Sequence, residues 1–344
     1  MQTLSKSTTE GAYAMLILTR EDILKVFSMR DAIEADKKAF VLHTEGRAVV
    51  PLRINIDNEA RDGQIMFMPA YVGGGLNAGG VKIVSCFTGN REKGLPVIPA
   101  TMAVVDGDTG VVSAILDGTT LTQLRTAAIS GAAIELLATP DASVGALFGT
   151  GGQAPAQLEA LMTARKLSEV RVYDALEGRA DAFAAQYAPL AEKFGTKLVP
   201  AKTPKEAVTD ADVITAVTTS REPVFDAADI KDGCHVTGVG AYTPEMREIP
   251  AELLARASRI FVDNREAVLA EAGDFIIAER EGKFSPGMIA GELGELLLGR
   301  AEGRRSPKDV TIMKTVGFAT LDVVAAAEVV KKAKAAGAGL EVAL

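Results

Sequence analysis

The feature that most constrains the fold of this chain is a glycine-rich loop between an apolar strand and an apolar-periodic helix. The apolar run Val144–Phe148 leads directly into Gly-Thr-Gly-Gly-Gln-Ala at positions 149–154, and apolar residues at helical spacing follow. A second apolar run, Val170–Tyr173, ends at Asp174. A strand, a G-x-G-x-x-A loop, a helix and an acid about twenty residues further on form the fingerprint of a dinucleotide-binding βαβ unit.

Each small residue of the loop has a physical role in that fingerprint. Gly149 allows the tight turn, Gly151 lets the backbone approach a pyrophosphate, and Ala154 lets the helix pack closely on the strand. The N-terminus of the helix offers unpaired N–H groups and a partial positive charge to the phosphates. An ordinary glycine-rich turn is the alternative, and the complete strand, loop, helix and acid argue against it.

Asp174 narrows the choice of cofactor to NAD. A carboxylate at the tip of the second strand can accept hydrogen bonds from the adenosine ribose hydroxyls, and it would repel the 2′-phosphate of NADP. The next basic residue, Arg179, is five positions away. We therefore expect NAD(H) rather than NADP(H). The alternative is that Asp174 only caps the following helix.

Composition limits the classes of function. The 344 residues suffice for two domains, and a net charge of −8 argues against nucleic acid as the main partner. No apolar run approaches the length of a membrane span, and the polar first 14 residues lack the apolar region of a signal peptide. Cys86 and Cys234 imply no disulfide framework, and two histidines without a Cys/His cluster indicate no metal site. We expect a cytoplasmic protein that begins with an extension outside the folded core.

The pattern of elements differs between the two parts of the chain. Residues Ile23–Leu42 have helical spacing, and Ser28–Asp31 resembles a capping box for a helix through Phe40. Strand-like runs follow at 49–56, 64–68, 81–87, 101–105 and 111–115, which predicts an antiparallel sheet with one helix. From Ser143 onward apolar strands alternate with helices, as in doubly wound folds, and Leu321–Ala336 is a further helix. The predicted fold class is α/β, with a Rossmann-type doubly wound parallel sheet and a separate α+β domain.

Three basic residues stand out as candidates for chemistry. Arg53 lies in a strand-like run, Lys82 interrupts the apolar run Gly80–Val84, and Arg125 precedes a small-residue helix that leads into the fingerprint strand. A surface cation with its stem on apolar atoms is the alternative for each. Lys82 fits that alternative least, because a lysine among apolar neighbours is costly to bury without a partner or a function.

Together with the loop, these residues resemble the ornithine cyclodeaminase/μ-crystallin family. The resemblance runs from about Leu16 to about Lys332 and depends on the order and spacing of several short segments. They are Arg53, Met68–Ala70, Gly80–Lys82, Phe87–Asn90 with Gly94–Pro96, Leu116–Gly118 with Leu121–Thr122, Arg125–Ala128, Gly149–Ala154, Gly238–Gly240, Val262–Asp263 and Lys314–Gly317.

The resemblance implies a homodimer with two domains per chain. Residues 1–128 and 318–344 would form a domain that binds substrate and dimerises, and residues 129–317 a Rossmann domain that binds NAD. Members of the family act on small α-amino or α-imino acids, as cyclodeaminases, alanine dehydrogenases, and ketimine or Δ1-pyrroline-2-carboxylate reductases.

The resemblance also implies roles for single residues. Arg53 and Arg125 match positions that bind the substrate α-carboxylate, for which a planar guanidinium is suited. Lys82 matches a position that contacts the substrate and serves as proton donor or acceptor. The remaining matches are to cofactor contacts, namely Thr126, Gly149, Thr150, Gly151, Gln153, Ala154, Asp174, Thr218, Thr219, Val239, Gly240 and Lys314.

One departure from the family pattern bears on the reaction. Cyclodeaminases carry an aspartate, which acts on the side-chain amine of the substrate, where this chain has Tyr242; Glu245 is displaced by three residues. A neutral phenol cannot pair with a cationic ω-amine. We therefore expect an NAD(H)-dependent oxidoreductase of small α-imino or α-amino acids. The alternatives are an ornithine-type cyclodeaminase with tightly bound NAD, and a non-catalytic binder of cofactor and ligand.

Overall fold

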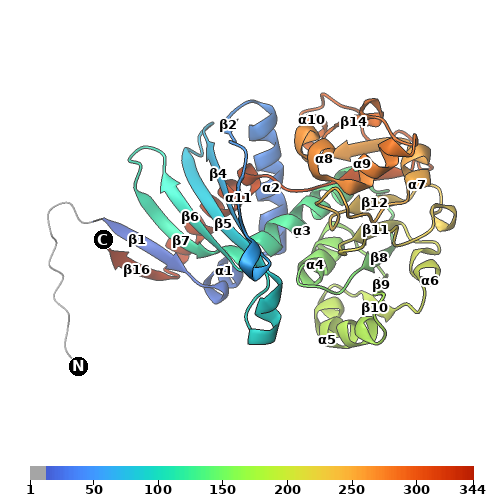
Figure 1. Cartoon of the computed structure of the whole chain (residues 1–344), viewed down its shortest axis with the longest axis horizontal. Coiled ribbons are helices and arrows are strands. Elements are labelled where there is room, and N and C mark those ends of the chain that lie inside the picture. The colour runs from blue at the N-terminus through green and yellow to red at the C-terminus, as the bar shows by residue number, and fades with distance from the viewer. Residues whose placement is uncertain (1–12) are drawn as a thin grey trace. The chain divides into compact units, whose positions relative to one another are not determined.

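A computed structural model describes residues 13–344, apart from the side chain of Arg91. Residues 1–12, most of the expected extension, lie outside the described part, and Ala14 already belongs to the first strand. The chain divides into two compact units (Figure 1). Of the described residues, the first comprises 13–28, 48–121 and 322–344, and the second comprises 29–47 and 122–321. Among the described residues, no helix is long and apolar enough to cross a membrane.

The first unit is built on one mixed sheet in the order β16-β1-β7-β6-β5-β4-β2, with β3 also paired to β4. All neighbouring strands are antiparallel except β1 and β7. The strands are β1 (Ala14–Leu18), β2 (Ala48–Val49), β3 (Ile54–Asn58), β4 (Gly63–Val72), β5 (Ala78–Phe87), β6 (Ala100–Asp106), β7 (Val112–Asp117) and β16 (Leu340–Ala343). The short helices α1 (Arg20–Val26), η1 (Glu59–Arg61) and η2 (Thr88–Lys93) connect them.

The two faces of this sheet are different. The long helix α11 (Ala319–Ala336) runs behind the strands in Figure 1, and Val323 on it lies close enough to β5 that a Cβ on Gly80 would be 3.3 Å from its side chain. Along β5, Lys82 and Val84 are buried and Ile83 between them is exposed. The alternation of a half-buried strand therefore places one face against α11 and leaves the other open.

The second unit contains a parallel sheet in the order β10-β9-β8-β11-β12-β15-β13-β14. The chain starts at β8, moves outward to β10, and returns to the other side of β8 at β11. Two loops therefore diverge at the ends of β8 and β11, where doubly wound folds bind ligands. The strands are β8 (Val144–Phe148), β9 (Glu169–Tyr173), β10 (Lys197–Pro200), β11 (Val213–Ala216), β12 (His235–Gly238), β13 (Arg259–Val262), β14 (Ile289–Glu292) and β15 (Thr311–Lys314).

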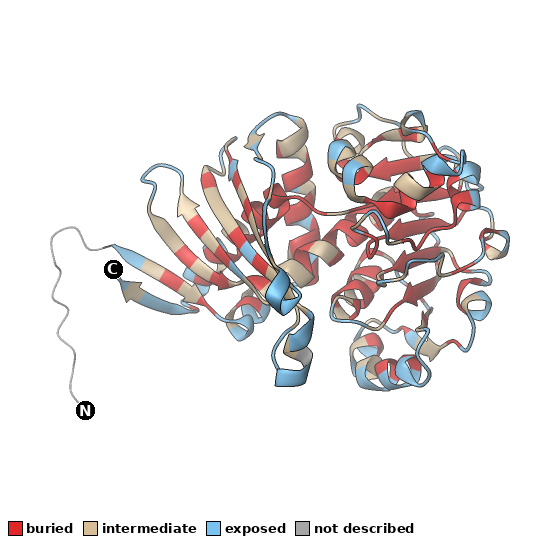
Figure 2. Cartoon of the chain, viewed as in Figure 1, coloured by how far each residue is buried: buried red, intermediate tan, exposed pale blue. Residues whose placement is uncertain are grey.

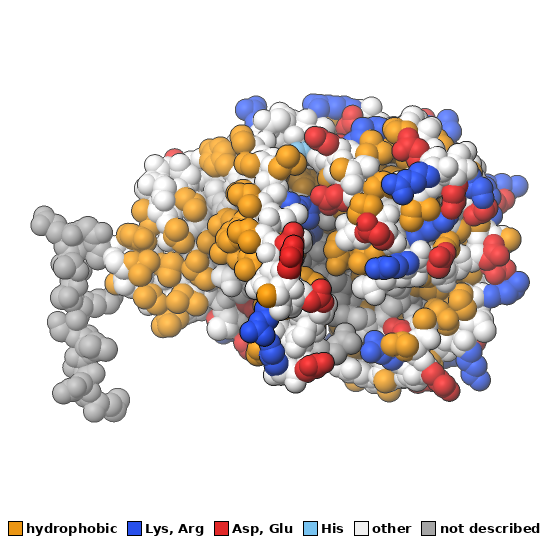
Figure 3. Space-filling view, in the orientation of Figure 1, with side chains coloured by type: hydrophobic (Ala, Val, Ile, Leu, Met, Phe, Trp, Pro, Cys, Tyr) orange, Lys and Arg blue, Asp and Glu red, His pale blue; other side chains and the backbone are white. Residues whose placement is uncertain are grey.

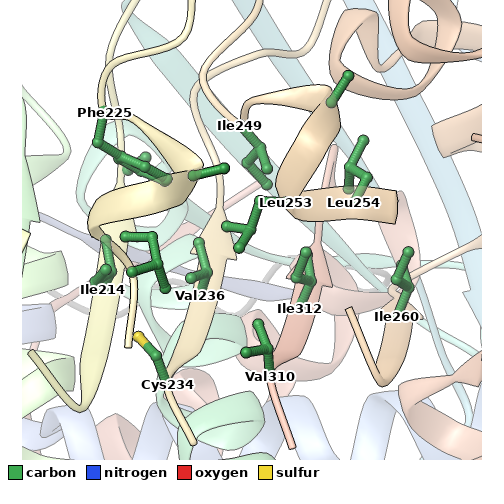
Figure 4. Packing of buried hydrophobic residues seen from close by; sticks show 14 of the residues in the cluster. Ile214, Phe225, Cys234, Val236, Ile249, Leu253, Leu254, Ile260, Val310 and Ile312 are labelled. Carbon is green, nitrogen blue, oxygen red and sulfur yellow. The ribbon is translucent and has the colours of Figure 1, made fainter. Parts of the chain in front are cut away.

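Helices cover this sheet, and apolar side chains fill both of its faces. Along β8, Ala146 and Phe148 pack into one buried cluster, while Leu147 between them packs into another. Figure 4 shows the first cluster, and Figure 2 shows the strands as almost wholly buried. The helices are α2 (Met29–Thr44), α3 (Gly118–Leu137), α4 (Ala154–Ala164), α5 (Arg179–Lys193), α6 (Pro204–Val208), α7 (Ala251–Arg256), α8 (Arg265–Glu271), α9 (Gly273–Arg280) and α10 (Leu293–Leu297), with the turns η3 (Ala227–Asp229) and η4 (Pro286–Met288).

The helical spacing over Ile23–Leu42 belongs to two helices, and the helix expected from a cap at 28–31 through Phe40 corresponds to α2. The chain is extended at Phe27, where α1 ends, and α2 begins at Met29. Helix α2 belongs to the second unit, because its apolar face packs on α10 and α4. The predicted domain, residues 1–128 and 318–344, therefore differs from the first compact unit at residues 29–47, 122–128 and 318–321, which belong to the second unit.

Candidate active site

The backbone at the end of β8 requires glycine. Gly149 has φ +94°, and a Cβ there would lie 2.7 Å from the carbonyl oxygen of Val217. Its N–H donates to the carbonyl of Tyr173 at 2.9 Å, which ties the loop to β9. Cβ atoms added at Gly151 and Gly152 would meet no atom within 4 Å. The loop is thus closed on the side of the sheet and open on the other side.

The first turn of α4 can receive an anion. Gln153 precedes the helix without a side-chain cap, and its buried Oε1 accepts no hydrogen bond. Pro155 in the first turn lacks an N–H, and the N–H of Ala154 donates to the carbonyl of Gly151 at 3.0 Å, so the donors left for a ligand are the N–H groups of the loop just before the helix. Open space over Gly151, together with these N–H groups at the positive end of the helix, fits the pyrophosphate of a dinucleotide.

Asp174 lies directly after β9 and faces the glycine loop. Its Oδ2 accepts from the N–H and hydroxyl of Thr150 at 3.0 and 2.6 Å, and its Oδ1 accepts from the N–H of Leu176 at 3.0 Å. The N-cap of α5 is Gly178, so Asp174 does not cap that helix. A carboxylate has about four acceptor positions, so Asp174 keeps capacity for a ribose hydroxyl. The residues present therefore fit NAD.

A buried carboxylate joins the loops after β11 and β12. Glu248 is fully buried, and it accepts from the N–H of Thr218 at 2.5 Å and from those of Gly240 and Ala241 at 2.6 and 3.0 Å. Burial raises the pKa of Glu248, and the nearby Lys314 opposes that rise. Val239 in the second loop is buried, and Thr219 in the first is exposed. The structure thus brings four of the expected cofactor residues to two joined loops.

Lys314 is among the expected cofactor contacts, and the structure places its side chain in a buried ion pair. Its side chain is fully buried, and its Nζ lies 2.8 Å from the equally buried Oδ2 of Asp274. An ammonium at the end of a buried strand needs a carboxylate to offset its desolvation, and Asp274 fills that role. The side chain of Lys314 therefore forms part of the buried interior of the unit, and its role toward a cofactor stays a prediction.

Arg125 lies in the first turns of α3 and is 5% exposed. Its guanidinium packs against Gly317, which has φ +77°; a Cβ there would lie 2.5 Å from Nη1. The backbone of this segment is held by Asp263, whose Oδ2 accepts from the hydroxyl of Thr315 and from the N–H groups of Val316 and Gly317 at 2.6, 3.0 and 2.6 Å. Asp263 therefore fixes the surface against which Arg125 packs.

Two further contacts connect α3 to the glycine loop and to α4. Gln123 donates to the carbonyl of Gly152 at 2.9 Å, and Gln157 donates to the carbonyl of Thr126 at 3.3 Å. Thr126 is half-buried. Helix α3 thus contributes to the position of the loop, which the fingerprint alone does not indicate.

In the first unit, Lys82 forms a buried ion pair. Its side chain is 2% exposed, and its Nζ lies 2.9 Å from both carboxylate oxygens of Asp322, which is fully buried at the start of α11. Met68 and Met102 flank Lys82 in the neighbouring strands. The sequence analysis predicted that Lys82 needs a partner or a function, but it did not identify Asp322.

Arg53 lies immediately before β3 and is half-buried. It precedes the strand, whereas the sequence pattern placed it within one. Lys82 lies two strands away in the same sheet, on β5, since β3 pairs with β4 and β4 pairs with β5.

Where cyclodeaminases carry an aspartate, this chain has Tyr242, so the acids in the surrounding segment are the remaining candidates for that role. Tyr242 is 43% exposed, Glu245 is also exposed, and the buried acid of the segment is Glu248. Glu248 is already bonded to three backbone N–H groups. Only an exposed acid therefore remains in this segment to meet a cationic substrate amine.

The chain is similar in sequence to characterised proteins over almost its whole length. The profile of the Ornithine cyclodeaminase/mu-crystallin family matches residues 14–337. The Delta(1)-pyrroline-2-carboxylate reductase of Bacillus cereus is 34% identical over 325 residues, which cover 94% of this chain and 98% of that protein. The chain therefore belongs to the ornithine cyclodeaminase/mu-crystallin family, and the predicted resemblance is confirmed.

Two solved structures share the fold. The Delta(1)-pyrroline-2-carboxylate reductase of Thermococcus litoralis, in complex with NADH and L-proline, has a TM-score of 0.89 and 36% identity, covering 95% of this chain and 100% of that one. An archaeal alanine dehydrogenase dimer with bound NAD has a TM-score of 0.87 and 32% identity, covering 96% and 99%. These similarities confirm the predicted fold class.

Proposed function

We propose that this member of the ornithine cyclodeaminase/mu-crystallin family is an NAD(H)-dependent reductase of small α-imino acids, with cyclic imines of the Δ1-pyrroline-2-carboxylate type as the expected substrates. The similar proteins of Bacillus cereus and Thermococcus litoralis have this activity by name. Open-chain substrates such as those of the similar alanine dehydrogenase belong to the same chemical class.

The observation that most supports this proposal is that position 242 is a tyrosine and that the buried acid near it already has hydrogen-bond partners. A cyclodeaminase needs a carboxylate for the ω-amine of its substrate, and this chain presents a phenol there. That acid, Glu248, is fully buried and already accepts hydrogen bonds from three backbone N–H groups. A substrate without an ω-amine needs no such carboxylate, so the residues present fit a cyclic or short imino acid.

In the proposed mechanism, Lys82 is the proton donor and two arginines bind the α-carboxylate of the substrate. Arg53 and Arg125 bind the α-carboxylate, because guanidinium groups form paired charge-assisted hydrogen bonds with it. Bound NADH supplies the hydride that adds to Cα. Lys82 donates a proton to the imine nitrogen, so the C=N bond becomes a CH–NH bond. Asp322 stabilises the ammonium before transfer, and solvent returns the proton afterwards.

On the cofactor side, the residues of the second unit divide into two groups. The glycine loop 149–154 and Asp174 are proposed to bind the pyrophosphate and the adenosine ribose. Thr218, Thr219, Val239 and Gly240 are proposed to contact the nicotinamide end. Thr126, on α3, is proposed as a further contact.

The open face of the first sheet supports a homodimer. Ile83, Phe67 and Ile54 are paired across β5, β4 and β3 on the face opposite Lys82, and Ile54 is 58% exposed. Figure 3 shows hydrophobic side chains gathered over these strands. Exposed apolar surface of this kind marks interaction sites, and the similar alanine dehydrogenase is a dimer. A charge at Ile54 (Ile54→Lys) should shift the mass in solution, measured by light scattering, toward a single chain.

The location of the protein is proposed to be the cytoplasm. Both cysteines are free, Cys86 half-buried and Cys234 buried. Burial raises the pKa of the Cys234 thiol to about 12, so it stays protonated and unreactive.

A paired assay tests the proposed reaction. Purified protein is given NADH and Δ1-pyrroline-2-carboxylate in one experiment, and NAD with ornithine in the other. Stoichiometric NADH oxidation with proline formation, abolished by Lys82→Met, is the expected result. Ammonia and proline from ornithine without net change in NADH would establish a cyclodeaminase instead. Binding of NADH without turnover in either experiment would establish a carrier of the cofactor.

A further inference from the structure

The side chain of Glu248 connects two loops that come from different strands. Its Oε1 accepts a hydrogen bond from the N–H of Thr218, two residues beyond β11. Its Oε2 accepts hydrogen bonds from the N–H groups of Gly240 and Ala241, beyond β12. The contact is close, since a Cβ on Gly240 would lie 2.0 Å from the carbonyl oxygen of Thr218. The carboxylate therefore fixes the spacing of the two loops.

The backbone at Glu248 is itself held by hydrogen bonds to a second buried carboxylate, that of Asp274. Oδ1 of Asp274 accepts from the N–H groups of Glu248 and Ile249 at 2.7 and 2.9 Å, and Asp274 is paired with Lys314. All of these side chains are fully buried. The segment around Glu248 therefore cannot move to compensate for a change at the loops, because breaking its buried hydrogen bonds would cost free energy.

The two joined loops serve only one end of the proposed cofactor. They carry the residues assigned to the nicotinamide. The glycine loop and Asp174, assigned to the adenosine half, are joined by two hydrogen bonds of their own, between Thr150 and Asp174. The hydrogen bonds of Glu248 go to the former pair of loops. The glycine loop meets these loops where Gly149 lies against Val217 and Thr218, so the effect of Glu248 should be largest at the nicotinamide end.

We infer that Glu248 is a positioning residue that sets the nicotinamide end of the NAD site through the backbone of Thr218 and Gly240. The inference rests on the proposed function, because it takes these loops as the nicotinamide contacts. It assigns no contact between Glu248 and the cofactor. A displaced nicotinamide would present its hydride donor in the wrong place, and small displacements of reacting atoms are expensive in rate.

The test compares two ligands that differ by the nicotinamide. NADH and ADP-ribose are titrated by calorimetry into the full-length protein and into Glu248→Gln, in which an amide NH₂ must face at least one N–H donor. Loss of a charge-assisted hydrogen bond of about 1–3 kcal/mol predicts that NADH binds about tenfold to a hundredfold more weakly. ADP-ribose should bind as it does to the unmodified protein. KM for NADH should rise, and kcat at saturating NADH should fall.

Two further variants make the comparison decisive. Glu279→Gln removes an exposed carboxylate of the same unit and should change neither affinity. Glu248→Asp keeps the charge but shortens the side chain, and it should weaken NADH less than Glu248→Gln does. Unchanged NADH affinity in Glu248→Gln, or equal weakening of NADH and ADP-ribose, would overturn the inference. If the unmodified protein binds ADP-ribose and NADH equally badly, the proposed function itself fails.

Discussion

Removing Asp322 should destabilise the first unit far more than removing the whole ion pair. Asp322→Asn takes the carboxylate from an ammonium that is 2% exposed and 2.9 Å away, so Lys82 is left as a buried cation beside a neutral amide. Breaking one partner of a buried pair costs about 3–5 kcal/mol, because the remaining charge has lost its compensation. Replacing both partners by apolar residues of similar volume is often neutral or stabilising.

The double variant Lys82→Met with Asp322→Leu should therefore be more stable than either single variant, and close to the unmodified protein. It should also be inactive, since the proton donor is gone. Stability and activity are then separated in one set of proteins. Glu341→Gln, an exposed carboxylate in β16 of the same unit, is the matched control and should have a small effect on both.

Urea unfolding followed by far-UV circular dichroism measures the stabilities, since the chain contains no tryptophan to report by fluorescence. The free energy of unfolding is obtained by linear extrapolation for each protein. The reasoning is refuted if Asp322→Asn unfolds at the same urea concentration as the unmodified protein. It is equally refuted if the double variant is less stable than both single variants, because the pair would then be net stabilising.

Three other predictions concern the ligands. Arg125→Ala should lower kcat/KM by about two orders of magnitude or more, because it removes a charge-assisted partner of the substrate from a buried site. NADH affinity should change little. Normal turnover would exclude Arg125 as a substrate ligand. Because Asp174 repels a 2′-phosphate, NADH should bind more tightly than NADPH in a fluorescence titration, and equal affinities would contradict this. Tyr242→Asp should weaken turnover of cyclic imino acids, in NADH oxidation assays, by adding an unpaired charge; faster turnover would show that the phenol does not serve the reductase reaction.

The features predicted best were those encoded within a few residues. The strand β8 has the predicted limits, Val144–Phe148, and Gly149, which was expected to allow a tight turn, has φ +94°. The hairpin from β6 to β7 is equally local, since Asp106 accepts the N–H and hydroxyl of Thr109 and Gly110 has φ +73°. Such turns are fixed by the conformational range of glycine and by short hydrogen bonds, so sequence pattern suffices.

The features missed depend on contacts between distant parts of the chain. Asp322 is 240 positions from Lys82, and Glu248 is 30 positions from Thr218. No pattern of local spacing identifies such partners. A signal did exist for Lys314, which ends an apolar strand just as Lys82 interrupts one. The argument that predicted a partner for Lys82 predicts one for Lys314 as well, and the resemblance to cofactor contacts in the family concealed it.

His43 shows how tertiary burial overrides a local expectation. It lies in the last turn of α2, where the helix dipole favours a cation. In the structure its ring packs against Phe318 at 4.7 Å between centroids, and burial lowers the pKa of His43, with only a partial opposing effect from Glu292 and Asp263. Desolvation therefore outweighs the dipole at this position.

His235 gives a prediction with a defined sign and pH range. It is fully buried in β12 between the hydroxyls of Thr311 and Thr237, at 2.9 and 3.0 Å. Burial lowers its pKa from 6.5 to about 3. Between these two values the unfolded chain binds one more proton than the folded chain, so the stabilising contribution is complete above the unfolded pKa and decreases as the pH falls toward 3.

The slope for one proton is about 1.4 kcal/mol per pH unit, so between about pH 6.5 and about pH 5 the folded state should lose about 2 kcal/mol on account of His235. His235→Gln retains hydrogen-bonding groups but cannot titrate, and its stability should lack this component. The buried acids Glu248 and Asp263, whose pKa values burial raises, act with the opposite sign but equally in both proteins, so the difference isolates the histidine. Urea unfolding at the two pH values measures it. Parallel pH profiles for the two proteins would mean that His235 is protonated in the folded state, and that the threonine hydroxyls accept from an imidazolium.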